Sequence, residues 1–181
     1  MEQTRIVKPL TLAHCSDIHL DGDHGDANHY MDGFVHVLAC AQAARPDVVV
    51  VAGDLFDSNR APSDIIEWAM DELAKQPCPV LMIPGNHDCM EPGAIFGRYD
   101  FNAIKNVEML LSADGEMRIV DSLNIAVWGK GMDEHSPAFR PVQDVTDRPD
   151  NVDWYIGIGH GMYVPDGGET YRSSPVHEGD I

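Results

Sequence analysis

The run DVVVVA at residues 47–52 restricts the fold more than any other segment. Four consecutive valines favour an extended strand, and the lack of polar alternation indicates that both of its faces are buried. Strands of this kind belong to parallel sheets that are covered on both sides. The sequence therefore predicts an α/β fold.

The neighbouring segments extend this pattern on both sides. Apolar runs at residues 10–15 and 79–83 predict two further strands. Strand, helix, strand units with this spacing imply parallel pairing through right-handed crossovers. The residues at helical spacing between the strands are Met31, Phe34, Val35, Leu38 and Ala41, and, after Pro62, Ile65, Ile66, Ala69 and Leu73.

After residue 105 the pattern changes. The segment 107–120 has Asp114-Gly115 between two apolar stretches, which predicts a hairpin. Further strands are predicted at 124–128 and 153–158, and residues 133–150 predict an irregular surface loop. We expect a second half richer in strands than the first, within a single domain over residues 1–181.

Composition excludes several classes of protein. A chain of 181 residues with 44% hydrophobic residues can bury a core, which excludes a mainly disordered chain. The net charge of -18 argues against general coating of nucleic acid. No apolar run reaches the length of a membrane span, so a cytoplasmic protein is expected. The cysteines form no CxxC pair and are expected to be reduced and buried; they are Cys15, Cys40, Cys78 and Cys89.

Four of the predicted strands end in side chains that can bind metal, three of them directly after a glycine. The carboxyl ends of parallel strands share one edge of a sheet, so these groups are expected to converge. A mixed set of oxygen and nitrogen donors favours Mn, Fe or Zn over Mg. The groups are Asp17 and His19, then Asp54 after Gly53, then Asn86, His87 and Asp88 after Gly85, and His160 after Gly159.

Each of these residues also has a purely structural interpretation. Asp17 and Asp54 are suited to capping the loops that follow their strands, and Asn86 is an ordinary turn residue. Metal-capable residues are much less expected to occur by chance at all four strand ends than at one, so a metal site is the favoured interpretation. Histidines at 14, 24, 29 and 36 share no such context and are interpreted as mainly solvated or packed, with His14 as a candidate support for a ligand.

Taken in order, the four motifs resemble the signature of calcineurin-like metallophosphoesterases. The motifs are Asp17-x-His19, Gly53-Asp54-x-x-Asp57, Gly85-Asn86-His87-Asp88 and Gly159-His160. The segments SDIHL, GDLFD and PVLMIPGNHD are most similar to the corresponding sequences of the SbcD-like DNA-repair exonuclease branch. The resemblance implies an αββα sandwich and a phosphoesterase that uses two divalent metals, with Mn preferred and Fe or Zn as alternatives.

The resemblance also implies a role for each residue. Asp17 and His19 would hold the first metal, Asp54 would bridge, and Asn86 and His160 would hold the second. Hydrolysis would proceed through a metal-activated hydroxide. The catalytic candidates are His87 as general acid and Asp88 as the residue that orients it, while Asp57 would orient a ligand.

One family motif is missing. Relatives carry a Gly-His-x-His motif after the position of Gly159-His160, whereas Met162 stands where the second histidine would be. His177 is the only histidine further along. The favoured explanation is a C-terminally truncated domain that lacks its last strands, and the alternative is a degenerate member that binds metal weakly.

Three functions remain open at this point. The first is a phosphodiesterase acting on DNA ends, with a homodimer or an ATPase as partner. The second is a phosphohydrolase of small nucleotides or other phosphoesters, which suits the acidic composition. The third is a non-enzymatic module that binds metal or a partner protein. No membrane partner is expected.

Overall fold

The computed structural model describes residues 7–21, 27–168 and 174–181. Its first sheet contains four parallel strands in the order β1-β2-β3-β4. The strands are β1 (Leu12–Cys15), β2 (Val48–Ala52), β3 (Val80–Ile83) and β4 (Val107–Met109). Every residue of β2 and β3 is buried, which confirms the expectation from the valine run.

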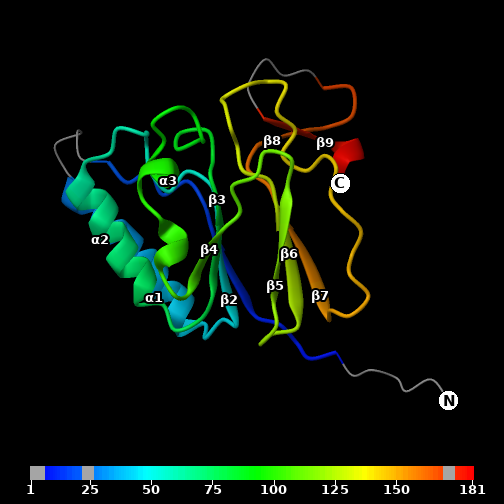
Figure 1. Cartoon of the computed structure of the whole chain (residues 1–181), viewed down its shortest axis with the longest axis horizontal. Coiled ribbons are helices and arrows are strands. Elements are labelled where there is room, and N and C mark those ends of the chain that lie inside the picture. The colour runs from blue at the N-terminus through cyan, green and yellow to red at the C-terminus, as the bar shows by residue number, and fades with distance from the viewer. Residues whose placement is uncertain (1–6, 22–26, 169–173) are drawn as a thin grey trace.

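Two long helices connect these strands and cover one face of the sheet. Figure 1 shows α1 (Ala27–Ala43) and α2 (Ser63–Ala74) on the same side of it, as right-handed crossovers require. Two short helices, α3 (Ile95–Arg98) and η1 (Phe101–Ala103), lie between β3 and β4. The side chains that the helices bury against the sheet include Phe34, Leu38, Ile65, Ile66, Ala69, Leu73, Ile95 and Phe101.

A second sheet packs on the other face of the first (Figure 1). It contains β5 (Glu116–Val120), β6 (Ile125–Gly129) and β7 (Trp154–Ile158) in that order. The core between the sheets is aliphatic and comprises Val48, Val50, Ala52, Leu81, Ile83, Leu110, Val120, Ile125, Val127 and Ile158. The α/β fold is thereby confirmed as one helical layer and two sheets, and the described residues form no helical layer outside the second sheet.

The predicted hairpin over 107–120 is wrong. β4 pairs with β3 in the first sheet, whereas β5 pairs antiparallel with β6 in the second. The turn at Gly115 therefore carries the chain from one sheet to the other, with the Gly115 Cα packed against the ring of Trp128. An Asp-Gly pair permits a tight turn but does not determine which strands pair on either side of it.

The end of the described chain forms a small third sheet. Its strands are β8 (Met162–Val164) and β9 (Pro175–His177), followed by η2 (Glu178–Asp180). Residues 133–150 have no helix or strand, as expected, and Arg140 ties this segment to Asp180 through an ion pair.

The cysteines are free, as expected, but only Cys89 is buried and Cys40 is exposed on α1, so the expectation of four buried thiols is wrong. Helical residues on the outer face of α1 are solvated whatever their polarity. In the described part of the chain, no helix has the length and apolar character needed to cross a bilayer.

Candidate metal centre

Three tight turns follow β1, β2 and β3 at the same edge of the first sheet. Asp17, His19 and Asp54 all adopt left-handed backbone conformations, with φ of 55°, 54° and 54°. This conformation is costly for residues other than glycine and is found where the surrounding structure holds it for a function. The strain lies at three of the residues that the sequence singled out as metal ligands.

Backbone hydrogen bonds hold the first turn against the second. The amide of Asp17 donates to the carbonyl of Gly53 at 3.1 Å, and the amides of Ile18 and His19 donate to the carbonyl of Asp54 at 2.9 and 3.1 Å. These bonds compensate for the strain and bring the two motifs together although 37 positions separate Asp17 from Asp54. The convergence expected from parallel strands is therefore observed.

Glycine is required where these turns touch. A Cβ on Gly85 would collide with the carboxylate and the backbone nitrogen of Asp54. A Cβ on Gly53, which has φ of 89°, would lie 2.5 Å from Nδ1 of His160. Both glycines let the backbone approach so closely that the side chains of Asp54 and His160 fit between the turns.

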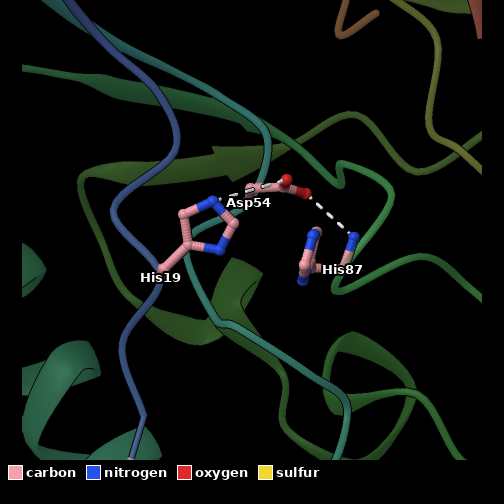
Figure 2. A group of neighbouring side chains, drawn as sticks. All are labelled: His19, Asp54 and His87. Atoms are coloured by element: carbon pink, nitrogen blue, oxygen red, sulfur yellow. Dashed lines mark hydrogen bonds and ion pairs between the residues drawn. The ribbon is translucent and has the colours of Figure 1, made fainter.

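Asp54 is the centre of the site and is only 1% exposed. Figure 2 shows its carboxylate between the rings of His19 and His87. One carboxylate oxygen accepts the backbone N–H of His87 at 2.9 Å, and the other lies 3.9 Å from Nε2 of His19 and 3.4 Å from Nε2 of His160. Burial raises the pKa of Asp54, but the donors His160 and His87 outweigh it and leave the pKa below its usual value.

Two groups of possible metal ligands share Asp54. In each group, one donor atom from every residue lies within 4.8 Å of the others. The groups are His19, Asp54 and His87, and Asp17, Asp54 and His160. A carboxylate common to both is in the position expected of a bridging ligand, whereas Asp17 groups with His160 rather than with His19.

His160 follows β7 and brings the second sheet into the site. Its Nδ1 lies 2.8 Å from the carbonyl of Ala52, and its Nε2 lies 3.1 Å from Oδ1 of Asn86. Burial lowers the pKa of His160, but the hydrogen bond and charge of Asp54 and the Ala52 carbonyl outweigh burial and raise it to about 9. The Ala52 contact fixes the ring so that Nε2 faces Asp54 and Asn86.

Asp57 holds two histidines at once. Its carboxylate lies 3.0 Å from Nδ1 of His19 and 3.5 Å from Nδ1 of His87, and its carbonyl accepts from Nδ1 of His87 at 2.7 Å. The two rings meet edge to face, 4.6 Å between centroids. The Asp57 carbonyl engages Nδ1 of His87, which leaves its Nε2 for a ligand or a substrate, whereas Nδ1 of His19 lies beside the Asp57 carboxylate without a hydrogen bond from the described residues.

Asp88 is fully buried and faces the backbone rather than His87. Its carboxylate accepts the amides of Gly85 at 2.7 Å and Phe56 at 3.2 Å. Burial raises the pKa of Asp88 to about 6, against the effect of these two donors, which lower it. These contacts hold the turns after β2 and β3 together, and the contacts that orient His87 come from Asp57.

The site opens into a cavity of about 820 Å³. Asp17, His19, Asp54, Asn86, His87 and His160 all line it, so the structure brings together every candidate except Asp88. His14 and His135 line it too, and motif patterns could not identify His135, which lies in the irregular segment. His177 lies in β9 and is not part of the lining.

The donor set fits divalent transition metals. Carboxylate oxygen, amide oxygen and imidazole nitrogen suit Mn, Fe and Zn, whereas Mg prefers oxygen alone. The ring nitrogens opposite the site are anchored by carbonyl or carboxylate oxygens, as in the outer shells of metal centres.

Comparisons with known proteins agree with this chemistry. The chain is 36% identical over 79 residues to the "Probable cyclic nucleotide phosphodiesterase" of Moraxella catarrhalis, which covers 44% of this chain and 27% of the relative. It is also 36% identical over 70 residues to a component of the nuclease SbcCD of Staphylococcus saprophyticus, which covers 36% and 18%. The chain thus spans less than a third of either relative, and the second match supports the SbcD-like branch.

Among solved structures, the Pseudomonas putida nuclease MPE is similar over 92% of this chain and 73% of its own, with 16% identity and a TM-score of 0.43. A family model described as calcineurin-like phosphoesterase matches residues 10–172, a range that contains all four strand-end motifs and the second sheet. The chain belongs to the calcineurin-like phosphoesterase family.

Proposed function

We propose that this site hydrolyses phosphodiesters with the help of two divalent metal ions. The observation that carries the proposal is Asp54, a buried carboxylate that belongs to both groups of possible ligands. A shared carboxylate offsets the repulsion between two neighbouring cations. The family membership supports a phosphoesterase, and relatives named as phosphodiesterase and nuclease support a diester substrate.

The proposed metal-binding roles are assigned to residues of this chain as follows. By the family resemblance, Asp17 and His19 would hold one ion and Asn86 and His160 the other, with Asp54 shared, whereas the geometry groups Asp17 with His160 and His19 with His87 around Asp54. Bound divalent ions supply Lewis acidity, which stabilises charge on the phosphoryl oxygens and lowers the pKa of water. The strained turns keep the carboxylates in place before a substrate arrives, so little reorganisation is needed.

His87 is the proposed general acid. Its Nδ1 is held by the carbonyl of Asp57, which leaves Nε2 facing the cavity to protonate the leaving oxygen. Asp88 supports it through the backbone, because its carboxylate ties Gly85, in the turn that carries His87, to Phe56, in the turn after β2. Both residues are thus proposed to serve catalysis, His87 directly and Asp88 by positioning.

The finer assignments rest on the relatives and on the sequence. A DNA end as substrate and a homodimer or an ATPase as partner are proposed from the SbcD-like motifs and the nuclease match. Mn is proposed from the mixed oxygen and nitrogen donors, and action in the cytoplasm stays a prediction from the sequence. A second candidate substrate, a small phosphodiester, is favoured by the site itself. No lysine or arginine lines the cavity among the described residues, and the chain carries a net charge of -18.

The test is metal-dependent hydrolysis of bis(p-nitrophenyl) phosphate by the Mn-loaded chain. We expect turnover that is lost on chelation and reduced by about 1,000-fold in Asp54→Asn. The matched control is Asp71→Asn, which changes an exposed carboxylate on α2 and should leave turnover unchanged. Turnover that survives in Asp54→Asn would contradict the proposal. Salt-sensitive retention on DNA would favour DNA over the small diester.

A further inference from the structure

Two histidines line the cavity without belonging to any of the four motifs. His14 comes from β1, and His135 comes from the irregular segment that follows β6. In the part of the chain that the structure describes, neither imidazole has a hydrogen bond or an ion pair with another residue. The other histidines of the lining, by contrast, are all held by Asp57, Ala52 or Asn86.

The backbone around His135 is nevertheless fixed. The amide of Met90 donates to the carbonyl of Met132 at 2.8 Å, and the amide of Ser174 donates to the carbonyl of Ser136 at 3.2 Å. The hydroxyl of Ser174 also donates to the sulfur of Met132. These bonds attach the segment on both sides of His135, so its ring is presented to the cavity from an anchored position.

The chemistry of this part of the lining suits a flat organic group. Pro137 and Met162 contribute apolar surface to the same lining as the two imidazoles. Imidazole rings stack on nucleobases, and a methionine thioether makes favourable contacts with aromatic rings. Of the two serines in the lining, Ser174 already donates its hydroxyl to Met132, which leaves Ser16 as the one serine hydroxyl in the described lining for a polyol.

The size of the cavity points in the same direction. A volume of about 820 Å³ lies in the upper part of the range for sites that bind small molecules of nucleotide size. A phosphate between the metal ligands would occupy only a fraction of it. Space therefore remains beside His14 and His135 for the group esterified to the phosphate.

We infer that His14 and His135 bind the organic half of the phosphodiester and favour a nucleoside over a small alcohol. The inference rests on the proposed function, because it names the substrate class of the same site. The two residues are specificity-determining rather than metal-binding. They explain how a site with no lysine or arginine in its described lining could still discriminate among phosphodiesters.

The test uses the Mn-loaded full chain and two substrates with one leaving group, the p-nitrophenyl ester of thymidine 5′-monophosphate and methyl p-nitrophenyl phosphate. For the unaltered chain we expect a lower KM for the nucleoside ester. His135→Ala should raise that KM by about 5-fold to 150-fold, the range for losing one stacking contact, and leave the methyl ester within about 2-fold. His14→Ala should act in the same direction.

His36→Ala is the matched control, because His36 is exposed on α1 and remote from the lining. Bound Mn per chain should not change in any of the three variants, and a loss of metal in His135→Ala or His14→Ala would overturn the specificity role. Equal effects on both esters, or no effect, would also overturn it.

Binding of thymidine 5′-monophosphate, followed by calorimetry, separates this inference from the proposed function. If neither ester is hydrolysed, the proposed function fails, and weaker nucleotide binding by His135→Ala than by His36→Ala would still support the nucleoside site. No binding by the unaltered chain would overturn the inference. Hydrolysis of both esters with equal KM would overturn the inference while leaving the proposed function intact.

Discussion

The two sheets differ in burial and in what they contribute to the site. In the first sheet, β2 and β3 are buried along their whole length between the helices and the second sheet. In the second, only β6 is buried throughout, and its flanking strands expose Ile119 at 47% and Trp154 at 42%. The first sheet carries the three left-handed residues, in the turns after β1 and β2, and the second contributes His160 alone among the proposed ligands.

Among the proposed metal ligands, left-handed backbone conformations are confined to the turns after β1 and β2. Asp17, His19 and Asp54 are held by hydrogen bonds between these two turns and by the buried strand β2, whereas β1 itself is partly exposed. The second sheet also has a left-handed residue, Asn124 before β6, but it lies at the opposite end of that sheet from His160, which is not among the left-handed residues. The strained candidates for metal binding thus all follow strands of the first sheet.

The largest effects should separate the proposed ligands of the two sheets. His19→Ala and His160→Ala should each lower bound Mn from about two ions to about one per chain, since each removes a ligand from one group only, and each should reduce diester hydrolysis by about 100-fold or more. Elemental analysis against protein concentration gives the metal count. Full occupancy in His160→Ala would show that the second sheet is dispensable for the metals.

Core substitutions should show the unequal burial directly. Leu81 is 0% exposed on β3 between the two sheets, so Leu81→Ala should lower the free energy of unfolding by about 3 kcal/mol through lost burial and a cavity. Ile119→Ala on β5 should change it by about 0.5 kcal/mol or less. Urea denaturation measures both, and equal losses would contradict the comparison.

Two glycine-to-alanine substitutions, one after β3 and one in β7, test how closely the backbone must approach its neighbours in each sheet. Gly85→Ala should cost about 2 kcal/mol and impair the metal site, because its Cβ would meet Asp54. Gly157→Ala on β7 has open space around the new Cβ and should be neutral or slightly stabilising. The same urea titration, with Mn binding as a second measurement, decides whether the close approach is as strict as the geometry indicates.

The smallest effect concerns thiol reactivity. Burial raises the pKa of Cys15, at the end of β1, to about 11, because it disfavours the charged thiolate. At pH 8 only about one Cys15 thiol in a thousand is then ionised, and its rate of alkylation should rise about tenfold per pH unit up to its pKa. Mass spectrometry after iodoacetamide treatment should find the exposed Cys40 labelled first, and prompt labelling of Cys15 would contradict its burial.

Local features of the fold and the positions of the ligands can be predicted from the amino-acid sequence alone. The valine run 47–52 specifies a buried strand, the helical spacing before and after it specifies α1 and α2, and the strand-end motifs locate Asp17, His19, Asp54, Asn86 and His160. The predicted elements and the convergence of these five residues agree with the structure, because each depends on neighbours in the chain or on the shared edge of a parallel sheet, while their role as metal ligands stays a prediction.

Contacts between distant segments emerge only when the chain packs in three dimensions. Packing places β4 and β5 in different sheets and brings His135 to the cavity. It also places the Asp57 carboxylate beside His19 and His87, and the Asp88 carboxylate against backbone amides. None of these has a local signal, because the partner lies tens of positions away and the choice among partners is made by packing. Short-range patterns specify elements, whereas long-range burial specifies which side chains meet.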